Sequence, residues 1–227
     1  MIALGRRGRT PLALVDGAVH VWPVRRSDGG DPVARVLARY IRPADGELTI
    51  VRGAGKPHLD ESGADVRFNV AHAGSILLVA VARGREIGVD VEPLGRGPWL
   101  SLPGHVLTPA ELRSLDGLAG RARDASFLRL WTRKEAVLKA AGVGLAVDPG
   151  LVAVSGPAEP PAVLGVPASM GPAARWGLVD LPLPGYAAAV AVERPHAPVV
   201  VLPRTPPSLR VLTKSLRLRD VRLTRAL

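Results

Sequence analysis

Apolar and polar positions alternate along this chain in short runs that predict strands and a few helices. The two longest apolar runs, Ile76 to Ala82 and Tyr186 to Val192, are far too short to span a bilayer. They read as buried strands, although periodicity alone leaves a helix start open for the first. Val19 to Val24 alternates, and Ile87 to Val91 is rich in β-branched residues, so both predict strands. Further strands are expected at Leu48 to Arg52, Phe68 to His72 and Arg175 to Val179.

Three segments carry helix signals. Pro32 follows Asp31 and predicts a first helix from Pro32 to Tyr40, because proline is tolerated in the first turn. Thr108-Pro109-Ala110-Glu111 combines an N-cap, a proline and a glutamate three residues after the cap. The longest helix is expected from Asp124 to Ala141, with an apolar stripe along it and Gly142 as its stop.

The Gly/Pro-rich segment from Pro93 to Pro103 divides the chain into two halves, each reading as strand, helix and several strands. This order predicts an α+β protein of two similar lobes with a ligand cleft between them. The lobes are expected at residues 1–100 and 101–195. Residues 196–227 form a basic, proline-containing tail that is not expected to join a packed core.

Composition narrows the class of protein. The chain has 227 residues, 47% of them hydrophobic, and no cysteine, which excludes disulfides and thiolate metal sites and agrees with a cytoplasmic location. No apolar run follows the basic start, so no signal peptide is expected. The net charge is +10, and residues 204–227 hold seven basic residues against one acid. This tail is either a solvated appendage or an attractor for a nucleic acid, an acidic protein or a polyphosphate.

Two acidic segments carry the candidate chemistry. Asp90 and Glu92 lie two apart in a predicted strand, so both carboxylates point to one face. Glu135, in the longest predicted helix, can add a third. Three carboxylates suit Mg²⁺, which keeps some waters and takes phosphate oxygens as further ligands. The alternatives are that the strand acids face solvent and that Glu135 and Lys139 form an ordinary helix-surface ion pair.

Four segments in this order resemble the Sfp-type 4′-phosphopantetheinyl transferases over about Val19 to Val192. Each is weak alone, and their order and spacing carry the resemblance. The segments are Gly55-Lys56-Pro57, Phe68-Asn69-Val70-Ala71-His72-Ala73-Gly74, Gly88-Val89-Asp90-Val91-Glu92, and Trp131-Thr132-Arg133-Lys134-Glu135-Ala136 with Lys139.

The resemblance implies a fold of two α/β lobes related by a pseudo-two-fold axis, with the active site between them. It implies transfer of the phosphopantetheine arm of coenzyme A to a serine of an acyl or peptidyl carrier protein, releasing adenosine 3′,5′-bisphosphate. Asp90, Glu92 and Glu135 would hold Mg²⁺ against the pyrophosphate. Glu135, or a metal-bound water relayed by Glu92, would accept the serine proton. Lys139 would meet the phosphate on the leaving side.

The same resemblance implies a coenzyme A site in the N-terminal half. His72 would contact the 3′-phosphate, Ala71 would offer backbone N–H, and Lys56 would contact the nucleotide. The alternatives are a structural histidine and a free surface lysine. Trp131 is expected in the core, anchoring the helix that carries Glu135.

The chain departs from the family pattern in two places. Ala71-His72-Ala73 stands where the family has Ser-His-Ser, and a lost neutral donor costs about 0.5–1.5 kcal/mol. The N-terminal lobe is also shorter than in the family, between Val24 and Val36, where a phosphate-contacting arginine is expected. Both departures predict weaker coenzyme A binding.

The sequence thus predicts a monomeric transferase that uses Mg²⁺ and coenzyme A and docks an acidic carrier protein on a basic surface. No membrane contact and no nucleic acid are expected as its main partners. Three alternatives stay open. They are a divergent homologue without transferase activity, a nucleic-acid-binding protein acting through the tail, and another Mg²⁺-dependent enzyme acting on small nucleotides. The sequence does not identify the carrier or its pathway.

Overall fold

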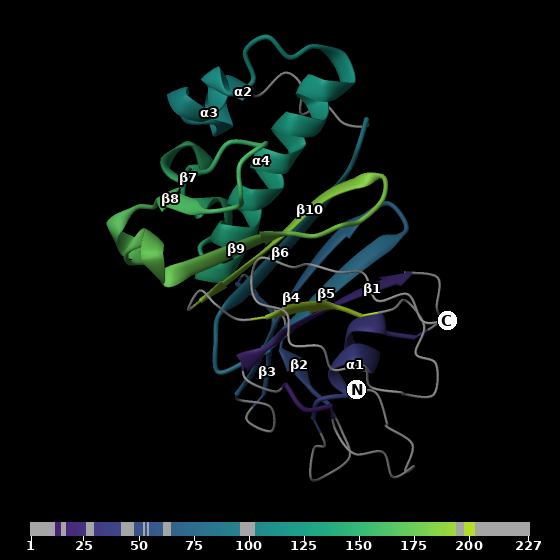
Figure 1. Cartoon of the computed structure of the whole chain (residues 1–227). Coiled ribbons are helices and arrows are strands. Elements are labelled where there is room, and N and C mark those ends of the chain that lie inside the picture. The colour runs from purple at the N-terminus through teal and green to yellow at the C-terminus, as the bar shows by residue number, and fades with distance from the viewer. Residues whose placement is uncertain are drawn as a thin grey trace.

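Two sheets pack face to face, and each carries a helix on its outer side (Figure 1). The computed structural model describes residues 12–14, 17–25, 30–41, 48–51, 53, 55–60, 65–95, 103–193 and 198–202. Its helices are α1 (Pro32–Leu37), α2 (Pro103–Val106), α3 (Pro109–Arg113) and α4 (Gly120–Ala141). Its strands are β1 (Val19–Arg25), β2 (Ile50–Val51), β3 (His58–Leu59), β4 (Val66–Ala73), β5 (Ile76–Arg83), β6 (Ile87–Pro93), β7 (Ala153–Val154), β8 (Val163–Gly165), β9 (Trp176–Asp180), β10 (Tyr186–Glu193) and β11 (Val199–Val201).

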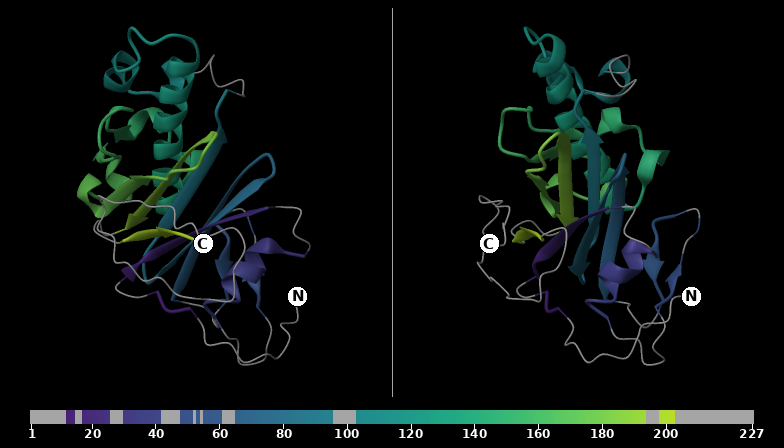
Figure 2. Two further views of the ribbon diagram at one scale, coloured as in Figure 1. Left: turned by 45° about the vertical axis from the view of Figure 1, so that its right-hand side comes forward. Right: turned by 90° about the vertical axis from the view of Figure 1, so that its right-hand side faces the viewer.

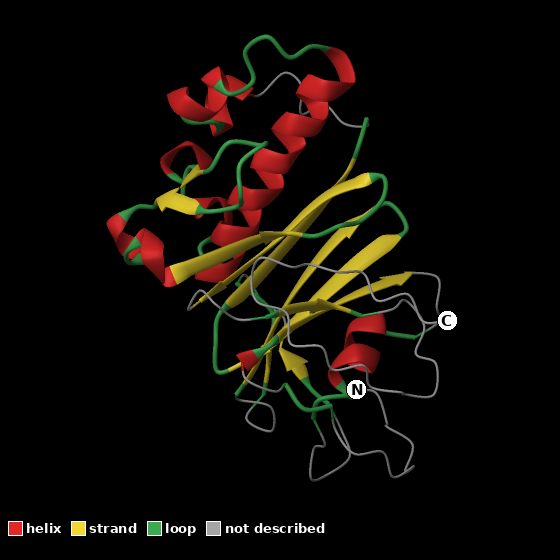
Figure 3. Ribbon diagram, in the orientation of Figure 1, coloured by secondary structure: helices red, strands yellow, loops and turns green. Residues whose placement is uncertain are grey.

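The first sheet has the order β11-β1-β5-β4 and the second the order β6-β10-β9 (Figure 3). The β1–β11 pair is parallel, and the other pairs of these two sheets are antiparallel. Turned views show α1 against the first sheet and α4 against the second (Figure 2). The predicted α+β class is therefore confirmed, with mixed sheets and few helices.

The central strands of the two sheets are buried on both faces. Along β5, Leu78 and Ala80 face the core between the sheets, whereas Leu77 and Val79 face α1. The same holds for β10, where Val190 and Val192 face the first sheet and Ala189 and Ala191 face α4. Sheets covered on both faces need continuous apolar strands. The 76–82 run is therefore a strand, and its helix alternative is wrong.

β6 belongs to the sheet of the C-terminal half. It pairs with β10 along its whole length, Asp90 opposite Ala189. The chain therefore changes sheet at the turn through Gly84, before the Pro93 to Pro103 connection that the sequence suggested as the boundary. Periodicity identifies a strand but not the sheet that it joins.

A short strand lies inside the segment expected to stay outside the core. Val199, Val200 and Val201 pair in parallel with β1, and the side chains of Val199 and Val201 are buried between the sheets. Three consecutive β-branched residues favour a strand despite the prolines around them. The expectation that no packed structure follows Pro195 is therefore wrong for these residues, and residues 203–227 lie outside the described part of the chain.

The predicted helices are present with shifted ends. α1 ends at Leu37 and is followed by a turn, and α4 begins at Gly120, four residues before the predicted start. The capping box at Thr108 and Glu111 is formed, and Gly142 ends α4 at a φ of 73°. No described helix is long and apolar enough to cross a membrane.

Two charged side chains of α4 are fully buried and tie the helix to the C-terminal half. Lys134 Nζ lies 2.6 Å from Glu111 Oε2 and donates to the carbonyl oxygens of Pro149 and Val152 at 3.0 and 2.6 Å. Arg133 forms two hydrogen bonds with Asp180, at 2.9 and 2.7 Å, and donates to three backbone carbonyls of the 155–159 segment. These bonds fix both the position and the rotation of α4.

We expect Lys134→Met to lower the free energy of unfolding by about 3–5 kcal/mol, because it leaves the buried Glu111 carboxylate without its cation. Arg121→Met, at an exposed position of the same helix, should change it by less than about 0.5 kcal/mol. Urea unfolding followed by circular dichroism measures both. Equal effects in the two variants would show that the buried pair does not anchor α4.

Candidate active site

A floor of small residues lets α4 lie directly on the second sheet. A Cβ added to Gly88 of β6 would stand 2.1 Å from the Ala136 carbonyl oxygen and 2.3 Å from the Ala140 nitrogen. The β10 residues paired with positions 88, 90 and 92 are all alanines, and their side chains face α4. The backbones of β6 and α4 therefore touch, which a larger residue at position 88 would prevent.

This contact brings the two acidic segments of the sequence together. Asp90 and Glu92 follow Gly88 at intervals of two, so all three face α4. Glu135 and Lys139 lie one turn apart on α4 and meet them there. The prediction that Asp90 and Glu92 share a face is confirmed, and the alternative that Asp90 faces solvent is wrong, since it is buried.

Lys139 is the cation of the cluster. Its Nζ donates to Asp90 Oδ1 at 2.6 Å and lies 3.9 Å from Glu135 Oε2. The side chains of Asp90 and Glu135 are only 7% and 12% exposed. The Glu135–Lys139 contact is therefore part of a buried cluster and not an ordinary surface pair.

The cluster holds more negative charge than Lys139 balances. Asp90 Oδ2 and Glu135 Oε1 are buried and have no hydrogen-bond partner among the residues that the structure describes. Burial raises the pKa of Asp90 against the lowering effect of Lys139, and burial together with Asp90 raises the pKa of Glu135. Burial and the charge of Asp90 raise the pKa of Glu92 to about 7, while a hydrogen bond from Trp131 opposes the shift.

The donor set suits a hard divalent cation. Carboxylate oxygens are the ligands that Mg²⁺ prefers, and two of them here are buried without a partner. Among the residues that the structure describes, no three acidic or histidine side chains already form a ready ligand set. The chemistry of the cluster thus fits the predicted magnesium ion, and the ion itself stays a prediction.

His72 lies near this cluster, at the end of β4. Its side chain is exposed, and its positive form lowers the pKa of Asp90. The neighbouring side chains of Ala71 and Ala73 are buried in the apolar core between the sheets. Alanine therefore fits the packing at both positions. Within the Ala71-His72-Ala73 segment, only the side chain of His72 is accessible to a ligand.

Lys56 does not join the cluster. Its Nζ donates to Glu86 Oε2 at 2.8 Å and to the carbonyl oxygen of Ile87 at 2.6 Å, at the opposite end of β6 from Glu92. Its side chain is 17% exposed, and burial lowers its pKa. The alternative of a free surface lysine is wrong.

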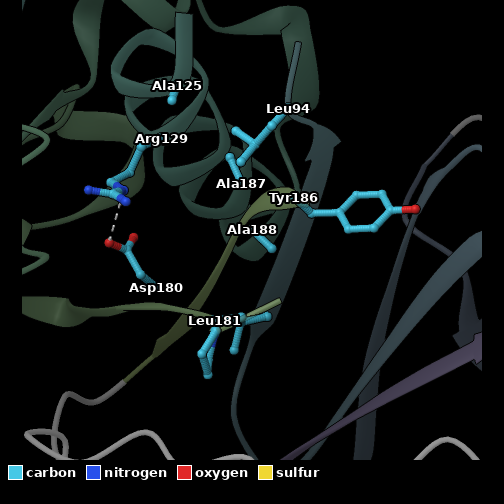
Figure 4. Close-up of a pocket in the computed structure, with 9 residues that line it drawn as sticks. Leu94, Ala125, Arg129, Asp180, Leu181, Tyr186, Ala187 and Ala188 are labelled. Atoms are coloured by element: carbon cyan, nitrogen blue, oxygen red, sulfur yellow. Dashed lines mark ion pairs between the residues drawn. The ribbon is translucent and has the colours of Figure 1, made fainter. Parts of the chain in front are cut away.

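A surface hollow of about 230 Å³ lies between α4 and the β9–β10 hairpin (Figure 4). Arg129 and Asp180 pair at one wall, Leu94 and Leu181 supply apolar surface, and Tyr186 points away from the ion pair. None of the clustered acids lines it. The hollow borders the cluster through Ala187, the β10 residue paired with Glu92, but the acids themselves do not line it.

Two residues that help to hold the site in place, Gly88 and Trp131, were not given this role from the sequence. Gly88 was quoted only as part of a motif, although a glycine inside a strand often marks a close backbone approach. Trp131 packs against the core of the C-terminal half, as expected, but it is only half-buried, and the hydrogen bond from its indole N–H to Glu92 was not foreseen. No local pattern signals that bond, because its partners lie on different elements.

Comparison with known proteins agrees with this arrangement. The 4′-phosphopantetheinyl transferase superfamily matches residues 86–191, which contain β6, α4, β9 and most of β10. The 4′-phosphopantetheinyl transferase HetI of Nostoc sp. is 33% identical over 174 residues, covering 74% of this chain and 70% of HetI. The 4′-phosphopantetheinyl transferase AcpT of Salmonella typhimurium is 34% identical over 89 residues, 39% of this chain and 46% of AcpT.

A protein of Synechocystis sp., slr0495, named as a candidate 4′-phosphopantetheinyl transferase, is 38% identical over 113 residues, 48% of this chain and 46% of slr0495. The matches thus span about half the length of slr0495 and AcpT and a larger share of HetI. This chain belongs to the 4′-phosphopantetheinyl transferase family.

We expect Gly88→Ala to push α4 away from β6, because the new methyl group meets two backbone atoms that cannot rotate aside. Overpacking of this kind costs about 1–3 kcal/mol or more of stability. Gly104→Ala, where a Cβ would have nothing within 4 Å, is the matched control. Urea unfolding of both variants tests the contact, and an unchanged midpoint for Gly88→Ala contradicts it.

The raised pKa of Glu92 predicts a pH dependence in metal-free buffer. The ordinary pKa of a glutamate is 4.5, and that of Glu92 in the folded state is about 7. Between these two pH values, the folded state binds the Glu92 proton more tightly than the unfolded state does. Stability should therefore fall as pH rises through that window. Asp90 and Glu135 add to the fall in the same direction.

Glu92→Gln removes one titrating group, so it should make this fall shallower and stabilise the protein at pH 8. Thermal unfolding with EDTA at pH 5, 6, 7 and 8 gives the slope for both proteins. An unchanged slope in Glu92→Gln would show that the Glu92 pKa is not raised.

Proposed function

We propose that this protein transfers the 4′-phosphopantetheine arm of coenzyme A to a serine hydroxyl of an acyl or peptidyl carrier protein, releasing adenosine 3′,5′-bisphosphate. The observation that carries the proposal is the pair of buried, partnerless carboxylate oxygens on Asp90 and Glu135, in a chain of this family. Leaving such oxygens unpaired is costly in a folded protein. A cation and a polyanionic substrate remove that cost.

Asp90, Glu92 and Glu135 would hold Mg²⁺ in this cluster. The ion, when bound, supplies charge neutralisation to a pyrophosphate. The fold of the chain determines the positions of the carboxylate oxygens that would bind the ion. β6 fixes Asp90 and Glu92 on one face, and the buried contacts of Arg133 and Lys134 fix the rotation of α4 that aims Glu135.

Lys139 provides the positive charge on the protein side. Its ammonium is held by Asp90 and is 28% exposed, so it can also donate outward to a phosphate oxygen. His72, exposed at the end of β4 and close enough to affect Asp90, adds a second group for an anionic substrate. Together they would orient coenzyme A against the acid cluster.

The transfer forms a bond between the serine oxygen and the phosphorus that carries pantetheine. It breaks the bond from that phosphorus to the bridging oxygen, which leaves with adenosine 3′,5′-bisphosphate. The serine proton passes to a carboxylate, for which Glu135 and Glu92 are the two candidates. The side chain of Glu92 is partly exposed, so a proton that it accepts or relays can pass on to solvent.

The carrier protein is proposed to be acidic. The net charge of +10 favours association with such a partner, and surface charges of opposite sign speed the encounter. The serine must reach the cluster between β6 and α4. The carrier therefore docks over the exposed side of this cluster.

The test is to incubate the protein with coenzyme A, Mg²⁺ and a panel of apo-carrier proteins and to measure the intact mass of each carrier. We expect one carrier to gain one phosphopantetheine, and the gain to stop with EDTA. Glu135→Gln should slow the transfer by roughly 10²–10⁴-fold, the typical loss on removing an acid–base group.

Asp116→Asn, an exposed carboxylate outside the cluster, should transfer at the wild-type rate and serves as the matched control. No mass gain on any carrier, together with no detectable binding of coenzyme A, would contradict the proposed function. It would instead favour a homologue without transferase activity.

A further inference from the structure

β6 is an edge strand that carries two of the clustered acids. It pairs with β10 on one side only, and its other edge faces β4 of the first sheet. In an extended strand, alternate residues direct their backbone N–H and C=O groups to the same edge. The free edge of β6 therefore presents the backbone groups of Ile87, Val89 and Val91.

Side chains from two distant segments bond to this edge. The backbone N–H of Val89 donates to Asn69 Oδ1 at 2.9 Å, and both groups are buried. The carbonyl oxygen of Ile87 accepts a hydrogen bond from Lys56 Nζ at 2.6 Å. In a wider sheet, the backbone of a neighbouring strand would make these hydrogen bonds. Here the side chain of Asn69 accepts one of them, and the side chain of Lys56 donates the other.

Lys56 is itself held in place. Glu86 Oε2 accepts from its Nζ at 2.8 Å, and Arg67 lies 3.1 Å from the other oxygen of Glu86. Two of the three ammonium protons are thus engaged within the protein. Ile87 precedes Asp90 by three residues, which is about 10 Å along a strand.

We propose that Lys56 and Asn69 are positioning residues that replace a neighbouring strand along the free edge of β6 and thereby fix Asp90 and Glu92 against α4. The catalytic consequence rests on the proposed function, whereas the structural role does not. Lys56 is then not a nucleotide contact, in contrast to what the family resemblance implied.

The physical chain from the edge to the site is short. Gly88 lies between the two bonded residues and touches the α4 backbone, so β6 cannot shift without moving the contact that places Asp90. A buried backbone group left unpaired is costly and favours a rearrangement that exposes it to water. Losing either side chain would therefore loosen β6 next to the acids.

Lys56→Met and Asn69→Leu test the proposal in the full chain with coenzyme A and with 3′-dephospho-coenzyme A. We expect kcat to fall roughly tenfold in each variant, because an unpaired buried group destabilises the working geometry. KM should stay within about twofold for both substrates, as a positioning role predicts. Arg83→Met, which removes an exposed, paired cation from β5, should leave both constants unchanged.

A raised KM for coenzyme A in Lys56→Met that is absent with the dephosphorylated substrate would overturn the proposal for Lys56. It would show a direct contact to the 3′-phosphate. The substrate pair separates the two roles, because only a phosphate contact depends on that phosphate.

Amide hydrogen exchange tests the structural role without any activity. In Asn69→Leu, the Val89 amide should exchange at least roughly tenfold faster, whereas the Asp90 amide, directed to β10, should keep its protection. Equal protection of Val89 in the variant and the wild type would overturn the role of Asn69. If the wild-type protein transfers nothing, the proposed function fails, and this exchange experiment still decides the structural role.

Discussion

The backbones of β6 and α4 touch at Gly88, and the rest of the candidate site depends on that contact. Alanines on the neighbouring strand β10 keep the floor under α4 flat, so the helix lies close along its length. Alternation along β6 then directs Asp90 and Glu92 toward the helix. Buried charges on α4 set its rotation, which brings Glu135 and Lys139 to Asp90. The acid cluster thus follows from one glycine and the packing around it.

The cluster also explains why the site is costly to fold and useful once folded. Three carboxylates share one lysine, two of their buried oxygens have no partner, and the pKa of Glu92 is raised to about 7. Buried ionisable groups with unpaired charge and shifted pKa values are concentrated at functional sites, where a bound ligand can compensate that charge. By contrast, the equally buried Lys134 and Arg133 have every charge matched by a protein partner, which is typical of an anchoring role.

Local patterns in the sequence predicted those features that depend on neighbouring residues. Alternation placed Asp90 and Glu92 on one face, and the capping box and Gly142 were read correctly. The features that were missed depend on residues far apart in the chain. β6 joins the sheet of the C-terminal half, β11 joins β1, and Lys56 bonds to Glu86 and Ile87. Hydrophobic periodicity records which face of an element is buried, but it does not name the partner that buries it.

The most direct test of the account is a crystal structure of the protein with coenzyme A and Mn²⁺ in place of Mg²⁺, since the anomalous signal of manganese locates the ion. The account predicts one ion bound by at least two of Asp90, Glu92 and Glu135 and by an oxygen of the pyrophosphate. Lys139 should remain beside the cluster. An ion or a pyrophosphate bound elsewhere, with the acid cluster still closed on Lys139, would contradict the claim that the acid cluster of β6 and α4 is the active site.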